Sequence, residues 1–268
     1  MRRDRTISYS NILMVGCGKM GSALLNQWLD GGSRFTVADP ALESAPDGVR
    51  LVRGAEDLGD ALFDVVIVAI KPQAVDEVLP AYAARIAPGG YVLSIAAGCS
   101  IARLSRLLGG TPVVRVMPNL PAAVGKGVSG LCPGPGAQGS ALAHASALMQ
   151  RIGTAVVVDS EDMIDRVTAV SGSGPGYVFE WARAYVEAAI GLGFSPPDAR
   201  AMVLGTVEGA VAMALADPAA GLAELRDSVT SKGGTTAAGL AALNGDGGLS
   251  SRLRETLEAA YTRAVELR

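Results

Sequence analysis

The sequence predicts an α/β fold over residues 1–159, followed by an all-helical domain over residues 160–268. Two observations support this division. Short apolar runs alternate with helical stretches as far as residue 152, a pattern typical of a doubly wound parallel sheet with right-handed crossovers. From residue 161 onward the apolar positions recur almost entirely with helical spacing, although a serine- and glycine-rich run at 171–176 is expected to interrupt the helices.

A glycine motif follows the first predicted strand. Four apolar residues at 12–15 lead into Gly16, Gly18 and Gly21, in the order G-x-G-x-x-G, and a helical pattern continues over 22–29. In a Rossmann dinucleotide-binding domain, the first glycine makes the tight turn and the second lets the backbone approach a pyrophosphate. The third lets the helix pack on the sheet. The strand before the motif and the helix after it favour a dinucleotide site over a bare turn.

The second predicted strand ends in an acidic residue. Asp39 lies about 20 residues beyond the first glycine of the motif, where a carboxylate accepts hydrogen bonds from the ribose hydroxyls. A 2′-phosphate there would meet a like charge, Pro40 follows where an arginine could have neutralised it, and Glu56 adds a second negative charge. Arg50 and Arg53 are close enough in sequence to oppose this effect. We predict that NADH is used at least as well as NADPH.

Later strands are expected at residues 64–70, 90–95, 113–117 and 156–158. Because ligands bind outside the carboxyl ends of parallel strands, the residues that follow each strand are candidates for a site. Lys71 comes directly after one strand, with Pro72 behind it, and is predicted to point into the crevice. Ala96 and Ala97 follow the next strand, and their small side chains would let a cofactor lie close to the backbone. Taken alone, this Ala-Ala-Gly sequence favours a tight turn without a ligand.

A second glycine-rich stretch, DSVTSKGGTT at 227–236, precedes the helical sequence AAGLAAL. Two glycines after hydroxyl residues at a helix start can form an anion-binding cradle of backbone N–H groups. An ordinary capped helix has the same pattern, so the stretch alone leaves both interpretations open. The anion site is favoured because the chain already has a nucleotide site but no other candidate for a substrate site.

The composition excludes several classes. A net charge of −3 argues against nucleic acid as the main partner. The longest uncharged run, residues 127–150, is broken by prolines and glycines, so no membrane span is expected. The three cysteines are widely spaced, which is typical of a reducing cytoplasm and predicts neither a disulfide framework nor a metal site. The single histidine, His144, is interpreted as an ordinary helix residue.

The chain is unusually apolar for a soluble protein. Hydrophobic residues make up 49% and charged residues 18% of it, and the mean hydropathy is +0.32. This excess predicts that part of the exterior is buried against another subunit. Gly205 and Gly209 lie one turn apart in a predicted helix, which favours close approach of a second helix there.

Taken together, several separate stretches resemble the pyrroline-5-carboxylate reductase family. They are GCGKMG, AIKPQ, SIAAG, RVMPN, VSGSGPGYVF and, most specific, LRDSVTSKGGTT. The resemblance implies a Rossmann domain followed by a helical dimerisation domain, with a homodimer that can assemble into a ring of dimers. It also implies hydride transfer from NADPH or NADH to the C=N bond of pyrroline-5-carboxylate, a small-molecule substrate, giving L-proline.

The resemblance also implies roles for individual residues. Thr236 is expected to be the catalytic group that contacts the ring nitrogen, and the substrate would be bound by Glu161, Ser231, Gly234, Thr235 and Thr236. The cofactor would be bound by Gly16, Cys17, Gly18, Lys19, Met20, Asp39, Ile70, Lys71, Pro72, Ala96, Ala97 and Ser228. Three residues depart from the family pattern and bear on the cofactor's phosphate preference: Lys19, Glu56 and Leu120.

Two alternatives remain. A β-hydroxyacid dehydrogenase also begins G-x-G-x-M-G and has a helical second domain, but the mid-chain helix here lacks a lysine followed four residues later by asparagine. The chain could instead be a nucleotide-binding regulator without turnover. Oxidation of NADPH or NADH by pyrroline-5-carboxylate distinguishes the enzyme from the regulator.

Overall fold

A computed structural model describes residues 10–268. The chain divides into two compact units. The first runs through Pro175 and also includes the last segment of the chain, Ala260–Arg268, whereas the second is Gly176–Ala259. The chain therefore passes from the first unit into the second and then returns to the first.

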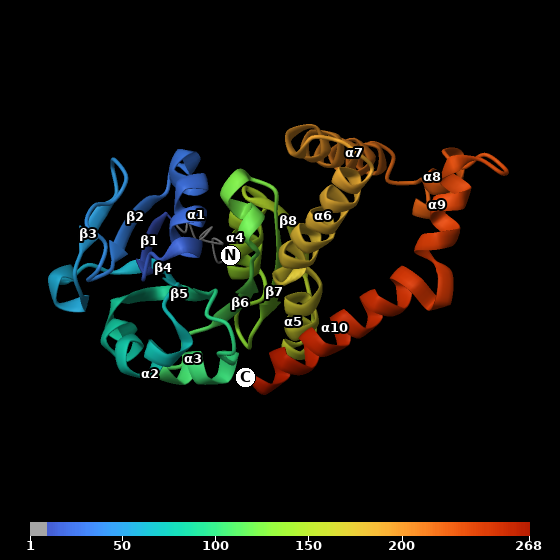
Figure 1. Ribbon diagram of the computed structural model, residues 1–268. Helices are drawn as coiled ribbons and strands as arrows, with labels where there is room; N and C mark the ends of the chain where they lie inside the picture. Colours follow the sequence, from blue (N-terminus) through green and yellow to red (C-terminus); the bar gives the residue numbers. More distant parts are fainter. Residues whose placement is uncertain (1–9) are drawn as a thin grey trace. The chain divides into compact units, whose positions relative to one another are not determined.

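The first unit is built on one eight-stranded sheet with the order β3-β2-β1-β4-β5-β6-β7-β8 (Figure 1). Neighbouring strands are parallel except for β6 and β7, which are antiparallel. The strand order reverses at β1, which lies between β2 and β4, and this is the switch point where doubly wound folds bind ligands. The strands are β1 (Asn11–Val15), β2 (Arg34–Ala38), β3 (Arg50–Val52), β4 (Phe63–Val68), β5 (Ile86–Ser94), β6 (Val113–Met117), β7 (Gly127–Pro133) and β8 (Gly153–Val157).

The central strands are apolar almost throughout because both faces of the sheet are covered. On one face the core is completed by α1 (Lys19–Trp28) and α4 (Ser140–Gln150), which are joined by the Trp28 indole N–H donating to the carbonyl of Leu148 at 2.8 Å. On the other face it is completed by α2 (Val75–Val78), α3 (Ile101–Leu107) and α5 (Glu161–Val167).

Short helical segments complete the first unit. They are η1 (Leu29–Gly31), η2 (Ala55–Leu58), η3 (Pro72–Ala74), η4 (Leu79–Arg85) and η5 (Leu120–Val124), all 3₁₀-helical, and the π-helical η6 (Thr168–Gly172). The expected interruption at 171–176 is thus confined to a π turn, and the next helix begins at Gly174. The buried Asn119 side chain fastens this turn: its Nδ2 donates to the Ser171 carbonyl at 2.9 Å, and its Oδ1 accepts the Val128 N–H at 2.8 Å.

The sequence did not predict β3 or β7. The latter contains two glycines and ends in proline, a composition that disfavours a strand. Gly130 is required there because a Cβ atom would lie 2.7 Å from the Val167 side chain of α5. The strand runs antiparallel to β6 because η5, rather than a crossover helix, connects the two. The sheet is otherwise parallel, as expected for a doubly wound fold, and β6–β7 is its one antiparallel pair among the described residues.

The second unit is helical. Its elements are α6 (Gly174–Gly191), α7 (Pro196–Ala216), α8 (Leu222–Ser228), α9 (Thr235–Leu243), the short η7 (Gly245–Gly247) and α10 (Gly248–Glu266), the first and last of which extend into the first unit. Ser195 caps α7 by accepting the Asp198 N–H, as its Ser-Pro-Pro-Asp sequence predicts. Many large apolar side chains in this unit are exposed, including Phe179 (65%), Leu192 (82%) and Leu215 (74%).

Candidate functional site

The glycine motif forms the turn between β1 and α1. Gly16 has a φ of +83°, and a Cβ atom at this residue would lie 2.6 Å from the Ile70 side chain, so only glycine fits. Gly18 differs because a Cβ atom there would meet nothing within 4 Å. Gly21 packs closely on the residue that follows β4, since a Cβ atom at Gly21 would lie 3.4 Å from the Ala69 Cβ. The space in front of Gly18, at the start of α1, is what an approaching pyrophosphate needs.

The side chains on either side of Gly18 point differently. The Cys17 side chain is 5% exposed and belongs to the core, and burial raises the pKa of its thiol. Met20 also packs on this core, whereas Lys19 is exposed at the first position of α1. Cys17 and Met20 could therefore contact a cofactor only through their backbone. The exposed side chain of Lys19 can reach a charged group on a ligand.

Asp39 is joined to the glycine turn. Its Oδ2 accepts the backbone N–H of Cys17 at 2.7 Å, and its Oδ1 accepts the N–H of Ala41 at 2.9 Å. The carboxylate thus lies where β2 ends, directly beside the turn that follows β1. This is the position from which an acidic residue reads the ribose of a dinucleotide.

The charged side chains around Asp39 bear on the predicted cofactor preference. The pKa of the buried Tyr82 hydroxyl is raised by burial first and then by the negative charges of Glu56 and Asp39. Both nearby arginines already bind backbone carbonyls. Arg53 donates to the backbone carbonyl of Leu42 at 2.6 Å, and Arg50 donates to the backbone carbonyl of Asp57 at 2.7 Å. Neither guanidinium pairs with Asp39 within salt-bridge distance among the described residues.

The ends of β4 and β5 meet the same edge of the sheet. Ile70 and Pro72 are half-buried, and Lys71 between them is exposed. Ala96 is 4% exposed and belongs to the core, while Ala97 is exposed. Of the two alanines, then, Ala97 and the adjoining backbone are available to a cofactor, and Ala96 supports the turn from below.

Glu161 makes two hydrogen bonds within the protein that its predicted role, a substrate contact, did not include. Its Oε1 accepts a hydrogen bond from Arg115 Nη1 at 2.8 Å and another from the backbone N–H of Ile101 at 3.0 Å. Arg115, on β6, is 2% exposed and also lies 3.5 Å from Asp165 on α5. The buried ion network Arg115–Glu161–Asp165 was not recognised in the sequence. An arginine inside the otherwise apolar strand VVRVM was the available signal, because buried charges are almost always paired.

The second glycine-rich stretch lies between α8 and α9. Gly234 caps α9 and donates its N–H to the Ser231 carbonyl at 3.0 Å, and Gly233 has a φ of +72°. Thr235 and Thr236 form the first two positions of this helix and are exposed, as is Ser231. The first intrahelical bond is donated by Ala238, so the N–H groups of the first turn point out of the helix end. Ser228, at the end of α8, donates to the Leu225 carbonyl at 2.7 Å.

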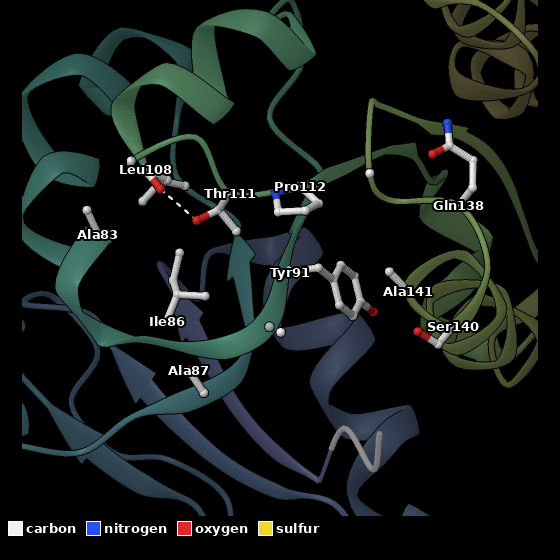
Figure 2. A pocket seen from close by; sticks show the side chains of 14 residues that line it. Ala83, Ile86, Ala87, Tyr91, Leu108, Thr111, Pro112, Gln138, Ser140 and Ala141 are labelled. Carbon is white, nitrogen blue, oxygen red and sulfur yellow. Dashed lines mark hydrogen bonds between the residues drawn. The ribbon is translucent and has the colours of Figure 1, made fainter. Parts of the chain in front are cut away.

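A different hollow lies at the opposite edge of the sheet (Figure 2). It has a volume of about 500 Å³ and is formed at the amino ends of β5 and β6, where Tyr91, Thr111 and Gln138 line it. The Thr111 hydroxyl donates to the Leu108 carbonyl, and the Tyr91 hydroxyl lies 2.8 Å from His144 Nδ1. Parallel sheets bind their ligands at the carboxyl ends, so this hollow is not the dinucleotide site.

His144 lies on α4, as its sequence context predicts. Burial lowers the pKa of its imidazole. Within the described residues no three His, Cys, Asp or Glu side chains gather as a metal site, and the three cysteines are free and buried. One described helix, α7, is long and apolar enough to cross a membrane; its most apolar window has a mean hydropathy of 1.4 and is 11% buried.

Known proteins match both parts of the chain. A model described as pyrroline-5-carboxylate reductase dimerisation matches residues 161–267, and one described as NADP oxidoreductase, coenzyme F420-dependent, matches residues 11–98. A pyrroline-5-carboxylate reductase of Pseudomonas aeruginosa is 36% identical over 97% of this chain and 98% of its own length. One of Haemophilus influenzae is 34% identical over 96% and 97%.

The chain belongs to the pyrroline-5-carboxylate reductase family. The structure agrees: that of a pyrroline-5-carboxylate reductase from Coxiella burnetii superposes with a TM-score of 0.90, at 31% identity, over 97% of this chain and 99% of that one. The Plasmodium falciparum pyrroline carboxylate reductase, whose structure was determined with NADP bound, has the same fold at a TM-score of 0.82 and 24% identity, covering 96% and 97% of the two chains. These findings confirm the resemblance and the predicted fold class, a Rossmann domain followed by a helical dimerisation domain.

Proposed function

We propose that this protein transfers a hydride from NADPH or NADH to the C=N bond of 1-pyrroline-5-carboxylate, giving L-proline. Membership of the family, at 36% identity over nearly the full length of a pyrroline-5-carboxylate reductase, carries this proposal. The glycine turn supports it, because Gly18 leaves open the space that a dinucleotide pyrophosphate would fill. The chain is accordingly an NAD(P)H-dependent oxidoreductase of this family.

The cofactor supplies the hydride, and the protein's residues bind and orient the two reactants. Gly16, Gly18 and the first turn of α1 would hold the pyrophosphate, and Asp39 would hold the adenosine ribose. Lys71, exposed at the end of β4, and Ala97, exposed at the end of β5, would border the bound dinucleotide. Ile70, Pro72 and the buried Ala96 support these strand ends.

The amino end of α9 is the proposed site for the substrate carboxylate. The N–H groups of Thr235 and Thr236 and the positive end of the helix dipole attract a carboxylate there. The Thr236 hydroxyl would contact the ring nitrogen, and Ser231 and Gly234 shape the loop. Ser228 is proposed to lie near the nicotinamide, and Glu161 near the substrate.

The chemistry needs little acid–base machinery. An imine accepts hydride readily only when it is protonated, and the iminium ion can form in solution before binding. The protein then lowers the barrier chiefly by holding the ring against the nicotinamide. This agrees with the position of His144, which is half-buried beside Tyr91 at the other edge of the sheet and takes no part in the proposed site.

We also propose that the helical part forms a homodimer, which can assemble further into a ring of dimers. Support comes from the dimerisation model over residues 161–267 and from the exposed apolar side chains of α6 and α7. The functional boundary is proposed at residues 159/160, one residue before that model begins. The apolar surface of α7, which also carries Asp198, Arg200 and Glu208, would then face a second subunit rather than lipid, in a cytoplasmic enzyme.

The test is a direct assay. Purified protein is mixed with NADPH or NADH and 1-pyrroline-5-carboxylate, and loss of absorbance at the reduced nicotinamide band is followed together with formation of proline. Turnover with proline as the product supports the proposal. A protein that binds the reduced cofactor but leaves it unoxidised would be a nucleotide-binding regulator, and the proposed function would be wrong.

A further inference from the structure

The last turn of the sequence is docked on α5. Arg268 Nη2 lies 2.5 Å from Oδ2 of Asp165, whose side chain is 3% exposed. Earlier in α10, the Tyr261 hydroxyl donates to Asp162 at 2.5 Å, and the Arg166 guanidinium lies 4.9 Å from the centre of the Tyr261 ring. All of these residues belong to the first unit, and the red end of the chain runs beside α5 (Figure 1).

Arg268 completes the charge balance of the buried ion network. Without it, the guanidinium of Arg115 would face two carboxylates, those of Glu161 and Asp165. With it, two positive charges meet two negative ones. Burial raises the pKa of Asp165, and the guanidiniums of Arg268 and Arg115 oppose that rise. A buried carboxylate that loses such a partner is strongly destabilising, so this contact has a structural consequence at Asp165.

The same turn of chain lies against the segment that follows β5. The carbonyl of Leu267 occupies the space beside Gly98, where a Cβ atom would overlap it. Gly98 has a φ of +68° in a turn closed by the Cys99 N–H and the Ala96 carbonyl at 3.4 Å. Ala97, at the centre of this turn, is exposed at the carboxyl edge of the sheet.

The ion network reaches the other end of this segment. Glu161, which pairs with Arg115, accepts the Ile101 N–H at 3.0 Å. The turn at 96–98 is therefore held from two sides: Leu267 abuts it at Gly98, and Glu161 fixes the chain just after it. Arg268 is linked to both contacts, since it is adjacent to Leu267 and pairs with the Asp165–Arg115–Glu161 network.

We propose that Arg268 is a positioning residue for the cofactor site: by pairing with Asp165 it seats Leu267 against Gly98 and holds the turn that presents Ala97 to the dinucleotide. The inference rests on the proposed function in one respect, the assignment of Ala97 to the cofactor site. Arg268 acts through the turn and contacts neither reactant. Its loss is expected to weaken cofactor binding while the rate with saturating cofactor changes little.

The test compares Arg268→Gln with Arg263→Gln. Arg263 lies on α10, five residues before Arg268, and forms an exposed ion pair with Glu266, so its substitution removes the same charge without touching Asp165. NADH binding is measured by fluorescence without substrate, on variants whose circular dichroism matches the wild type. Arg268→Gln should raise the Kd for NADH roughly three- to tenfold, within the range for residues that couple to a site they do not touch. Arg263→Gln should leave it unchanged, and Arg268→Lys, which keeps the charge, should restore part of the affinity.

A double variant keeps the inference testable even if Arg268→Gln is unstable, because it is compared with Asp165→Asn alone. In Arg268→Gln/Asp165→Asn the Kd for NADH should match that of Asp165→Asn, since Arg268 acts through Asp165. An unchanged Kd in folded Arg268→Gln, or a Kd in the double variant that exceeds that of Asp165→Asn, would overturn the inference. NADH binding is measured without pyrroline-5-carboxylate, so this test does not depend on turnover. A wild type that binds NADH but does not reduce the imine would disprove the proposed function, and the Kd values of the variants could still be compared.

Discussion

The carboxylate of Asp39 accepts the backbone N–H of Cys17, with 2.7 Å between Oδ2 and the nitrogen. This bond fixes the end of β2 to the turn that follows β1. One of the N–H groups inside the glycine motif is consequently used within the protein, and the negative charge of Asp39 is held at the rim of the turn. The position of that charge has a direct consequence for the choice between NADH and NADPH.

We predict that NADH is used at least as well as NADPH, and that Asp39→Ser moves the preference toward NADPH. Removing one like charge near the 2′-phosphate is worth roughly 1 kcal/mol in a solvated site, or about fivefold in the ratio of kcat/KM values. Steady-state kinetics with both cofactors measure it. Glu56→Gln is the comparison variant, since it removes a charge from the same rim but keeps the bond to Cys17. A wild-type preference for NADPH above about tenfold would mean that Arg50 and Arg53 leave their carbonyl partners to bind the phosphate.

Gly18→Val is expected to abolish cofactor binding in a folded protein. The backbone at Gly18 has a φ of −68° and a ψ of −167°, an extended conformation that valine adopts readily, and nothing lies within 4 Å of the added Cβ. The new side chain would occupy the space for the pyrophosphate. Fluorescence titration with NADH, beside thermal denaturation, checks both halves of the statement. Unchanged affinity in the folded variant would exclude the nucleotide site proposed here.

Thr236→Ala should lower kcat/KM for pyrroline-5-carboxylate by an amount equivalent to about 1–3 kcal/mol, the range for losing a hydrogen bond to a charged or buried group. The Kd for NADH should barely move. Thr256→Ala is the matched control, because Thr256 is a threonine of α10 whose hydroxyl donates to the Arg252 carbonyl. If Thr236→Ala behaves like this control, the stretch 233–236 only caps α9.

The protein is expected to be a dimer, or a multiple of one, through its helical part. Exposed side chains such as Val178 (54%), Trp181 (42%) and Tyr185 (44%) lie on one face of α6 and need a partner surface. Light scattering at micromolar concentration should therefore give at least twice the mass of one chain. The midpoint of urea denaturation should also rise with protein concentration, since unfolding then includes dissociation. A monomeric mass with a concentration-independent midpoint would contradict this.

Stability should fall on mild acidification, in part through His144. Burial lowers the pKa of this imidazole from its ordinary value of 6.5, so the unfolded chain binds a proton more readily than the folded one. The resulting stabilisation is present above pH 6.5 and is lost as the pH falls below that value. His144→Gln should therefore show a shallower dependence of the free energy of unfolding on pH across this window. Urea denaturation at several pH values measures it, and equal slopes in both proteins would refute it.

Local patterns predicted the nucleotide part of the fold well. The strands ending at Val15 and Ala38, the turn with Gly16 at positive φ, and Asp39 beside it all follow from residues close together in sequence. Each strand end that carried a predicted cofactor residue is at the carboxyl edge of the sheet. The sequence could not show that Ala96 is buried and Ala97 exposed, because that depends on which side of the turn faces the core.

Contacts between distant residues account for what was missed. Strand β7 was not predicted because Gly130 gives no apolar signal, and the reason for that glycine is the Val167 side chain of a later helix. The network of Arg115, Glu161 and Asp165 joins residues about fifty positions apart, and no periodicity links them. Glu161 was recognised by resemblance alone, without its buried partner. The roles assigned to all of the predicted site residues, among them Ser228, Ser231 and Thr235, stay predictions.

Residues 260–268 belong to the first unit, so the nucleotide-binding half is built from two separate segments of the sequence. A fragment cut after Pro175 would keep every strand of the sheet, yet it would uncover Gly98 and strip Asp165 of its pairing with Arg268. The two units therefore do not simply follow one another along the sequence, because the last segment of the chain belongs to the first unit. Excising the helical half to obtain a minimal dinucleotide-binding protein would require grafting this last turn back onto α5.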